Sequence, residues 1–398
     1  MKKIYYITAV FATLFLVGCG DGIDLPSVNV ETDLNKIPLP DNNVNLEQVE
    51  LKPSTEPMLH EGLHTEEDFQ RIRDKKAAGE EPWVSAYQLL VESQFSQKTA
   101  DTYPTEWIKR GVSGDENYMN AARGATIAYQ QALRWKIEQD DEYAAKAVEN
   151  LNKWVQTCVG VTGNTNLSLA AGLYGYEFAI AGELLRDYGG WDRADFAAFQ
   201  NWLLKVFYPA NDDFLKRHHD TNALHYWANW CLCNIAAKMA IGIVTDRRDI
   251  YNEGIAHLQT GDTNGRLRRA IYHDYAPDYN FAQWQESGRD QGHTLMCVGL
   301  MGVICQLAWS QGDDFFAYDD NLFLRACEYA ACCNYTNETV PYTTYIWQKQ
   351  SQWGYPIPEE QTTLGGGKWI KRAIWALPYY HCKGKRRIWG ACGHYEHP

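Results

Sequence analysis

Apolar residues recur at helical spacing along most of this chain. Between residues 118 and 132 they follow one another one or three positions apart, and between 143 and 154 they recur every three or four positions. Both patterns place the apolar side chains on one face of a helix. The two stripes consist of Tyr118, Ala121, Ala122, Ala125, Ala128, Tyr129 and Ala132, and then of Tyr143, Ala147, Leu151 and Trp154.

Helix start and stop signals extend this pattern. Thr65 followed by Asp68 is close to a capping box and predicts a helix that runs to Gly79. Asp192 is a suitable N-cap for a helix that ends at Pro209. The other predicted helices cover residues 167–185, 224–243 and 249–258, an apolar run that becomes helical near Arg289, and a last segment over 369–378.

Strand-like alternation of polar and apolar residues is almost absent before residue 335. The predicted helices are joined in pairs by short turns that contain Gly or Asp, which is typical of a bundle or a ring of helical hairpins. No exact sequence repeat supports a solenoid. We therefore predict a single all-α domain over residues 57–398, with an irregular tail that holds a short strand or two.

The first residues have the features of an export signal. Lys2 and Lys3 precede an apolar stretch from Ile7 to Val17, which is too short to span a membrane and is followed by Cys19 in a lipoprotein cleavage box. We expect residues 1–18 to be a signal peptide, Cys19 to carry lipid, and residues 19–56 to be a flexible tether. The protein would then be an exported outer-membrane lipoprotein, on the periplasmic face or the cell surface, that meets the membrane only through this anchor.

The charge balance restricts the partners. The net charge is −13, and removal of the signal peptide, which has two lysines and no acid, makes it more negative. Nucleic acid is therefore excluded as a partner, because phosphate binding needs clustered basic charge. An anionic polysaccharide stays possible, since surface charge is screened beyond about 8–10 Å at physiological salt. The 15 Trp and 25 Tyr residues would either stack on sugar rings or fill helix interfaces.

No pattern in the sequence requires a cofactor or a metal. The glycines at 365–367 lack the Lys-Ser/Thr ending of a phosphate-binding loop. Seven cysteines lie in apolar helical runs, where free cysteine behaves as a small buried hydrophobe, although export would permit disulfides. Two alternative metal sites have spacings that fit known motifs poorly: Cys382 with Cys392, His394 and His397, and His218 with His219, Asp220 and Glu286. We predict no metal.

Two polar clusters precede long apolar helices. One runs from Arg217 to Trp227 and the other from Gln285 to Thr294. On a helix, Asn222 and His225 would face the same way, as would Arg289 and His293. Asn222 would donate a hydrogen bond to an anion and His225 would transfer a proton, or else they are a helix cap and a half-buried surface histidine. In a ring of hairpins both clusters would meet at one cleft.

Four phrases resemble the alginate-lyase superfamily of polysaccharide lyases over residues 57–380. They are His60 to Asp68, Tyr118 to Ala122, Asn229-Trp230 before an apolar helix, and, most specifically, Gln285 to Thr294. The resemblance implies an incomplete (α/α) toroid whose cleft holds a uronate polysaccharide. It also implies a lyase that breaks a 4-linked uronate chain by β-elimination.

The resemblance implies roles for individual residues. Asn222 and His225 resemble the family's Asn and His before a Tyr-Trp pair, although Ala223 and Leu224 separate them here, and Arg289 resembles its carboxylate-binding arginine. The family's tyrosine after the arginine is missing, so the catalytic acid would be Tyr279, in preference to Tyr275 or Tyr226. His293 would be a second acid/base or would orient Glu286. Glu286 and Gln291 would be partners of Arg289 that contact substrate, or would form a structural salt bridge with it. Tyr226 and Tyr174 would be substrate-binding rings.

The sequence therefore predicts a monomeric, cofactor-free polysaccharide lyase whose substrate is alginate. The alternatives are a lyase for glucuronan or a glycosaminoglycan, and a surface lipoprotein that binds glycan without turnover. A glycoside hydrolase would need two carboxylates about 5–10 Å apart, for which Asp220 and Glu286 are the candidates.

Overall fold

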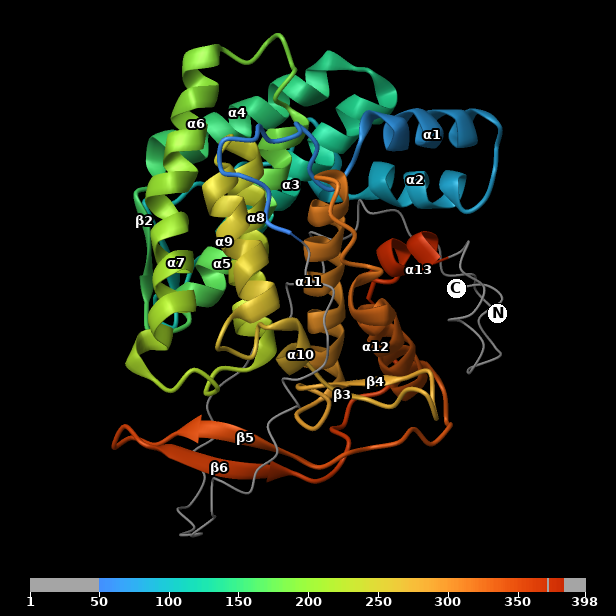
Figure 1. The fold of residues 1–398 in the computed structure, drawn as a ribbon. Coiled ribbons are helices and arrows are strands. Elements are labelled where there is room, and N and C mark those ends of the chain that lie inside the picture. Colours follow the sequence, from blue (N-terminus) through green and yellow to red (C-terminus); the bar gives the residue numbers. More distant parts are fainter. Residues whose placement is uncertain (1–49, 371, 383–398) are drawn as a thin grey trace.

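The computed structural model describes residues 50–370 and 372–382 (Figure 1). The predicted signal peptide, Cys19, Cys392, His394 and His397 lie outside these residues. Helices dominate the described part, and its strands are short. The helices are α1 (Glu66–Ala77), α2 (Trp83–Glu92), α3 (Tyr118–Glu138), α4 (Asp141–Thr157), α5 (Leu167–Leu184), α6 (Arg193–Val206), α7 (Tyr208–Arg217), α8 (Ala228–Val244), α9 (Arg248–Thr260), α10 (Leu267–Ala270), α11 (Gln291–Ser310), α12 (Tyr318–Tyr335) and α13 (Ala376–Cys382), with short 3-10 turns at Gln94–Ser96 and His218–Asp220.

An inner layer of helices forms the core. In α5, α8 and α11 almost every side chain is buried, and α3 is buried over most of its length. Such helices are apolar all round because they have no solvent face. The close approach of α5 to α8 needs a glycine: a Cβ at Gly172 would lie 2.5 Å from the Sγ atom of Cys233. Although α11 is long and apolar enough to cross a membrane, most of it is buried within the protein.

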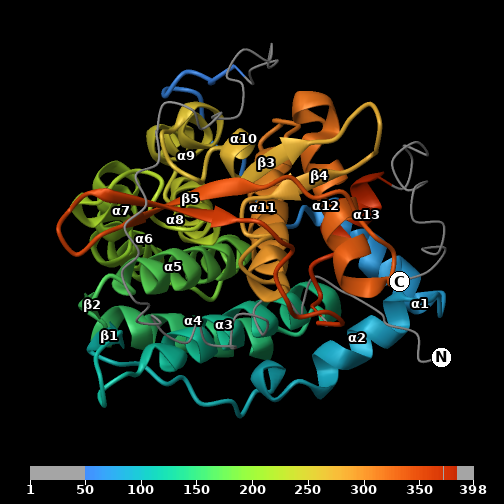
Figure 2. The same ribbon diagram turned by 90° about the horizontal axis from the view of Figure 1, so that it is seen from below.

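Further helices pack on this layer from outside, and of these α12 is itself buried over most of its length. α4 packs on α3, α7 and α9 pack on α8, and α12 packs on α11. Seen from below, α5, α8 and α11 lie centrally, with α4, α7, α9 and α12 around them (Figure 2). This pairing of inner and outer helices confirms the predicted all-α fold, an incomplete (α/α) toroid. The eight cysteines whose side chains are described are all free and buried.

The inner helices begin at the same end of the molecule. β1 (Trp107–Arg110) and β2 (Gly160–Gly163) pair in parallel, so α3 and α5, which follow them, start side by side. At the start of α5, the Ser168 carbonyl accepts a hydrogen bond from Asn234 of α8 at 3.2 Å. The Asn229 amide at the start of α8 donates to Glu286, just before α11, at 3.0 Å. The partial positive charges of these helix ends therefore gather at one end.

A β-hairpin crosses this same end, below the helices in Figure 1. Its strands β5 (Tyr345–Gln350) and β6 (Pro356–Gln361) pair antiparallel from Tyr345↔Gln361 to Gln350↔Pro356. A second antiparallel pair, β3 (Ile271–Asp274) and β4 (Ala282–Trp284), lies beside it. The hairpin agrees with the expectation of short strands late in the chain, although its position could not be predicted.

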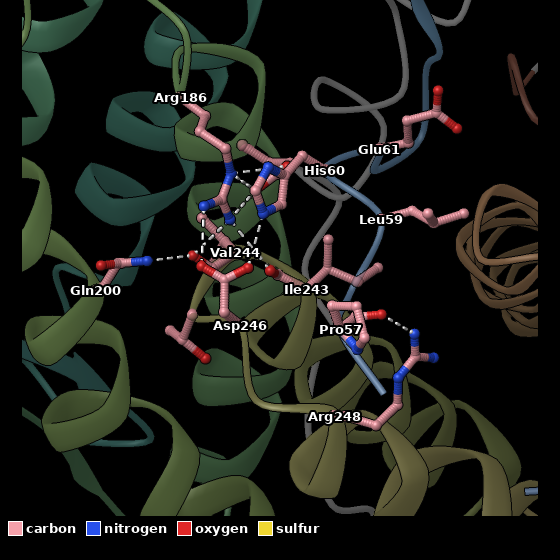
Figure 3. Close-up of polar contacts among 12 residues, drawn as sticks. Pro57, Leu59, His60, Glu61, Arg186, Gln200, Ile243, Val244, Asp246 and Arg248 are labelled. Carbon is pink, nitrogen blue, oxygen red and sulfur yellow. Dashed lines mark hydrogen bonds and ion pairs between the residues drawn. The ribbon is translucent and has the colours of Figure 1, made fainter. Parts of the chain in front are cut away.

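At the opposite end, charged contacts hold the segment before α1 against α5, α8 and α9 (Figure 3). Arg186 donates to Glu183, to Asp246 and to the carbonyls of Ile243 and Val244 at the end of α8. His60 Nε2 lies 2.9 Å from the same Asp246 carboxylate.

The segment before α1 makes contacts with the helices from Lys52 on. Arg248 donates to the carbonyls of Glu56 and Pro57, and Asn252 donates to the Lys52 carbonyl at 2.8 Å. Lys52 also lies 3.6 Å from Asp313. Residues 52–56 therefore contact α9 and the segment that follows α11, within the stretch predicted as a tether.

The observed helix boundaries show where local sequence patterns are enough to predict the start or end of a helix. The predicted capping box between Thr65 and Asp68 is present. Pro209 does not end a helix but stands in the first turn of α7, a position that proline tolerates. The helix predicted from residue 224 begins at Ala228, and the one predicted near Arg289 begins at Gln291. Within the described residues the last helix is Ala376–Cys382, so the helix predicted over 369–378 is found only from residue 376 on.

Candidate active site

The two polar clusters meet at the start of α8. The side chains of Gln285 and Glu286 accept the backbone amides of Ala228 and Asn229, each at 3.0 Å. Glu286 is completely buried and is also paired with Arg289, whose Nη1 lies 3.2 Å from its carboxylate. A carboxylate at a helix N-terminus and beside a guanidinium has two sources of positive potential. This contact joins segments 57 residues apart and positions Arg289.

A row of aromatic rings links His225 to Arg289. The His225 ring lies 6.1 Å from Trp347 of the hairpin, and Trp347 stacks on Trp227 at 4.5 Å. The Arg289 guanidinium carbon lies 5.3 Å from the Trp227 ring centre, within the range of a cation–π contact. The structure thus brings His225 and Arg289 to the same end of the molecule, as the ring-of-hairpins hypothesis required.

Asn222 holds the hairpin rather than starting a helix. Its amide nitrogen Nδ2 donates to the Gln348 carbonyl at 3.1 Å and to Gln350 Oε1 at 2.8 Å, and its Oδ1 accepts the Leu224 amide. Asn222 and Leu224 therefore form a side-chain turn before α8. The prediction that Asn222 is a free donor to an anion is contradicted in this conformation, because both of its amide protons are used.

His225 is fixed as a neutral hydrogen-bond donor. Its Nδ1 accepts the backbone amide of Gln350 at 2.8 Å, so in the neutral ring the proton is on Nε2. Burial, with a smaller contribution from Lys349, lowers the pKa of His225 to about 4. Within the described residues nothing is hydrogen-bonded to Nε2. A neutral histidine with this tautomer donates from Nε2 and does not serve as a base there.

Arg289 and His293 differ from their predicted arrangement. α11 begins at Gln291 because the Asp290 carboxylate caps the His293 amide at 2.8 Å, so Arg289 lies outside the helix. His293 Nδ1 is 2.5 Å from the Asp290 carboxylate. Burial opposes ionisation of Asp290, but the contacts with His293 and Arg289 outweigh it and hold the pKa of Asp290 below its usual value. His293 therefore pairs with Asp290, and its role as a second acid/base or as an orienting group for Glu286 stays a prediction.

The alginate lyase family model matches residues 72–338, more than half of the chain. The chain belongs to the alginate lyase family. It is therefore a polysaccharide lyase. Alginate lyase A1-III from Sphingomonas species A1 is 14% identical, with 69% of this chain and 79% of that chain covered and a TM-score of 0.48. An alginate lyase from Bacteroides ovatus is 15% identical, with 64% and 77% covered and a TM-score of 0.47. A search of curated proteins gave no match.

In this alginate lyase family member, four residues predicted to contact substrate are buried. Glu286 and Gln291 are inaccessible, and Tyr174 and Tyr226 are nearly so. Gln291 donates to the Gly365 carbonyl, Tyr174 lies within α5, and Tyr226 packs between the rings of His225 and Trp230. These positions support the structural alternative for Glu286 and Gln291, and the two tyrosines belong to the core.

The predicted tyrosines differ in access. Tyr279, between β3 and β4, is exposed, whereas the Tyr275 hydroxyl is 2.5 Å from Gln283 Oε1 and 3.1 Å from Thr343, and burial raises the Tyr275 pKa. Among the three tyrosines considered as the acid, Tyr279 is the one with an exposed side chain.

Sequence reasoning missed the hairpin residues Trp347 and Gln350. The only signal was the run of strand-forming residues Tyr345, Ile346 and Trp347, which is typical of a short strand. Their partners, His225 and Asn222, lie more than 120 residues earlier in the chain.

The described residues contain no group of three or more His, Cys, Asp and Glu side chains that could hold a metal. In the alternative metal site, His218 lies against Cys231, while Glu286 is engaged at the start of α8. Two cavities of about 290 and 650 Å³ lie near α1, at the other end from the hairpin, and neither is lined by a residue of the two polar clusters.

A glycine lets the tail of the chain pass against Arg289. A Cβ at Gly365 would lie 2.6 Å from the backbone of Arg289 and Asp290, whereas a Cβ at Gly366 would meet nothing within 4 Å. We expect Gly365→Ala to displace Arg289 and to lower lyase turnover about 10- to 100-fold, because small displacements of a positioned group are costly. Gly366→Ala is the matched control and should keep wild-type turnover in the same assay. Equal activities of the two variants would contradict this role.

Proposed function

We propose that this lyase cleaves a 4-linked uronate polymer by β-elimination and that alginate is its substrate. The observation that carries the proposal is the placement of two donors, the Arg289 guanidinium and the Nε2–H of His225, at the two ends of one row of aromatic rings. Both lie where the inner helices begin. The Arg289 side chain is 25% exposed, and within the described residues its Nη2 makes no hydrogen bond. An anionic sugar would meet a cation, a neutral donor and positive helix ends.

The chemistry needs these groups. Removal of the C5 proton of a uronate places additional negative charge on its carboxylate, and the C4–O4 bond then breaks to leave a 4,5-double bond. Fixed donors stabilise that developing charge without reorganising. We assign carboxylate binding to Arg289 and a hydrogen bond from Nε2 to His225. Both proton transfers fall to Tyr279, whose β3–β4 connection lies at the same end of the molecule (Figure 1). The Tyr279 oxygen takes the C5 proton and then gives a proton to the departing O4, with both on one face of the sugar.

The decisive assay follows the product's double bond. Purified protein is incubated with alginate, glucuronan and chondroitin, and ultraviolet absorbance and chain length are recorded together. We expect absorbance to rise with alginate as its chains shorten. If absorbance rose only with glucuronan or only with chondroitin, that polymer would be the substrate in place of alginate. Chain shortening without absorbance would indicate a hydrolase and overturn the proposal, as would binding of all three polymers without cleavage.

A further inference from the structure

The tip of the β5–β6 hairpin exposes two aromatic side chains. Trp353 is 74% exposed and Tyr355 is 55% exposed. Neither side chain makes a ring contact or a hydrogen bond with any described residue. Exposed aromatic surface gives no stability to the fold, so these rings are available to a ligand.

The turn that carries them is built by other groups. Ser351 Oγ accepts the backbone amides of Trp353 at 3.2 Å and Tyr355 at 3.1 Å. The Ser351 amide donates to the Tyr355 carbonyl, and Gly354 adopts a φ of 87°, which favours glycine. The backbone shape is therefore independent of the two aromatic side chains, which can be removed without loss of the turn.

The tip is held next to the candidate active site. Asn222 and His225 bind Gln350 and so fix the end of β5. Trp353 stands three positions after Gln350, a span of at most about 10 Å. The tip extends past α7 at the end of the molecule where the polar clusters meet (Figure 1). A polymer bound at Arg289 and continuing along the hairpin would reach it within a few sugar units.

The local charge suits an anionic sugar chain. Residues 351–356 at the tip include no acidic side chain, whereas β6 carries Glu359 and Glu360 farther along the hairpin, opposite Trp347 and Ile346. Lys349 forms no ion pair with any described residue, and its Nζ lies 5.9 Å from the Trp347 ring centre. The ring of Trp347, which could contact the C–H face of a sugar, and the ammonium group of Lys349, which could bind its carboxylate, thus lie along β5.

We propose that the hairpin tip is a second carbohydrate-binding site, in which Trp353 and Tyr355 stack on uronate units remote from the cleaved bond and Lys349 binds a carboxylate between them and His225. The identity of the ligand rests on the proposed function. The site would hold long chains in register with the active site and would contribute nothing to short ones.

The test is chain-length dependence in the double variant Trp353→Ala/Tyr355→Ala. Stacked aromatic contacts of this kind predict that KM for polymeric substrate rises about tenfold with kcat unchanged. KM for the shortest oligosaccharide that is cleaved should not change. Trp309→Ala is the matched control: Trp309 is 46% exposed near the other end of α11 and should alter neither constant.

An unchanged polymer KM in the double variant would overturn the proposal, as would an equal rise for short and long substrates. If the wild-type protein cleaves none of the polymers, calorimetric titration with alginate and glucuronan replaces the kinetic assay. Weaker polymer binding by the double variant would then support the site although the proposed reaction had failed, and equal binding would refute the site as well.

Discussion

Arg289→Ala is expected to lower turnover of the uronate polymer by about 10²–10³, the usual cost of removing one fixed donor to a developing negative charge. The same substitution should also destabilise the protein, because Glu286 would remain as a completely buried carboxylate without its guanidinium partner. Breaking a buried pair in this way costs about 3–5 kcal/mol. Activity and thermal unfolding must therefore be measured together.

A second substitution separates the two effects. In Arg289→Ala/Glu286→Gln the buried charge is absent, while the glutamine oxygen still accepts the Asn229 amide. We expect the double variant to regain stability in thermal unfolding and to remain inactive. If activity returned together with stability, Arg289 would be a purely structural partner of Glu286, and its role in carboxylate binding would be refuted.

The fold was predictable because its signals are local. The stripe from Tyr143 to Trp154 and the capping box at Thr65 depend on residues three or four positions apart, and both helices form as predicted. The errors in the predicted helix boundaries arise where a side chain from a distant part of the chain determines at which residue a helix starts. Residues 224–227 have apolar character, yet α8 starts only at Ala228, where Gln285 and Glu286 supply acceptors for its first amides.

The candidate site was predictable in its location and not in its contacts. Two polar clusters at the starts of apolar helices must be solvated, paired or used, and a ring of hairpins brings such helix starts together. The sequence could not show that a hairpin more than 120 residues later would form hydrogen bonds with the side-chain amide of Asn222 and with Nδ1 of His225. These contacts change Asn222 from a free donor into an anchor and determine which nitrogen of His225 remains available.

The available nitrogen of His225 gives the second large effect. His225→Ala should lower turnover by about 10² through loss of the Nε2–H donor. Two further variants divide the functions of the ring. His225→Asn keeps an acceptor near Nδ1 for the Gln350 amide but lacks the donor, and His225→Gln places an amide donor near Nε2 but lacks that acceptor. If donation matters, the glutamine variant recovers part of the activity and the asparagine variant does not. The reverse order would make His225 an anchor for the hairpin.

The pH profile tests the same assignment independently. Because burial and Lys349 lower the pKa of His225 to about 4, the ring stays neutral at pH values between about 5 and 7. Protonation of Nδ1 would also displace the Gln350 amide. His225 should therefore add no loss of kcat/KM as the pH falls from 7 to about 5, and its contribution should be lost only near its own pKa of about 4. A fall near pH 6.5 that disappears in His225→Gln would show instead that the ring titrates as an ordinary histidine and works as a base.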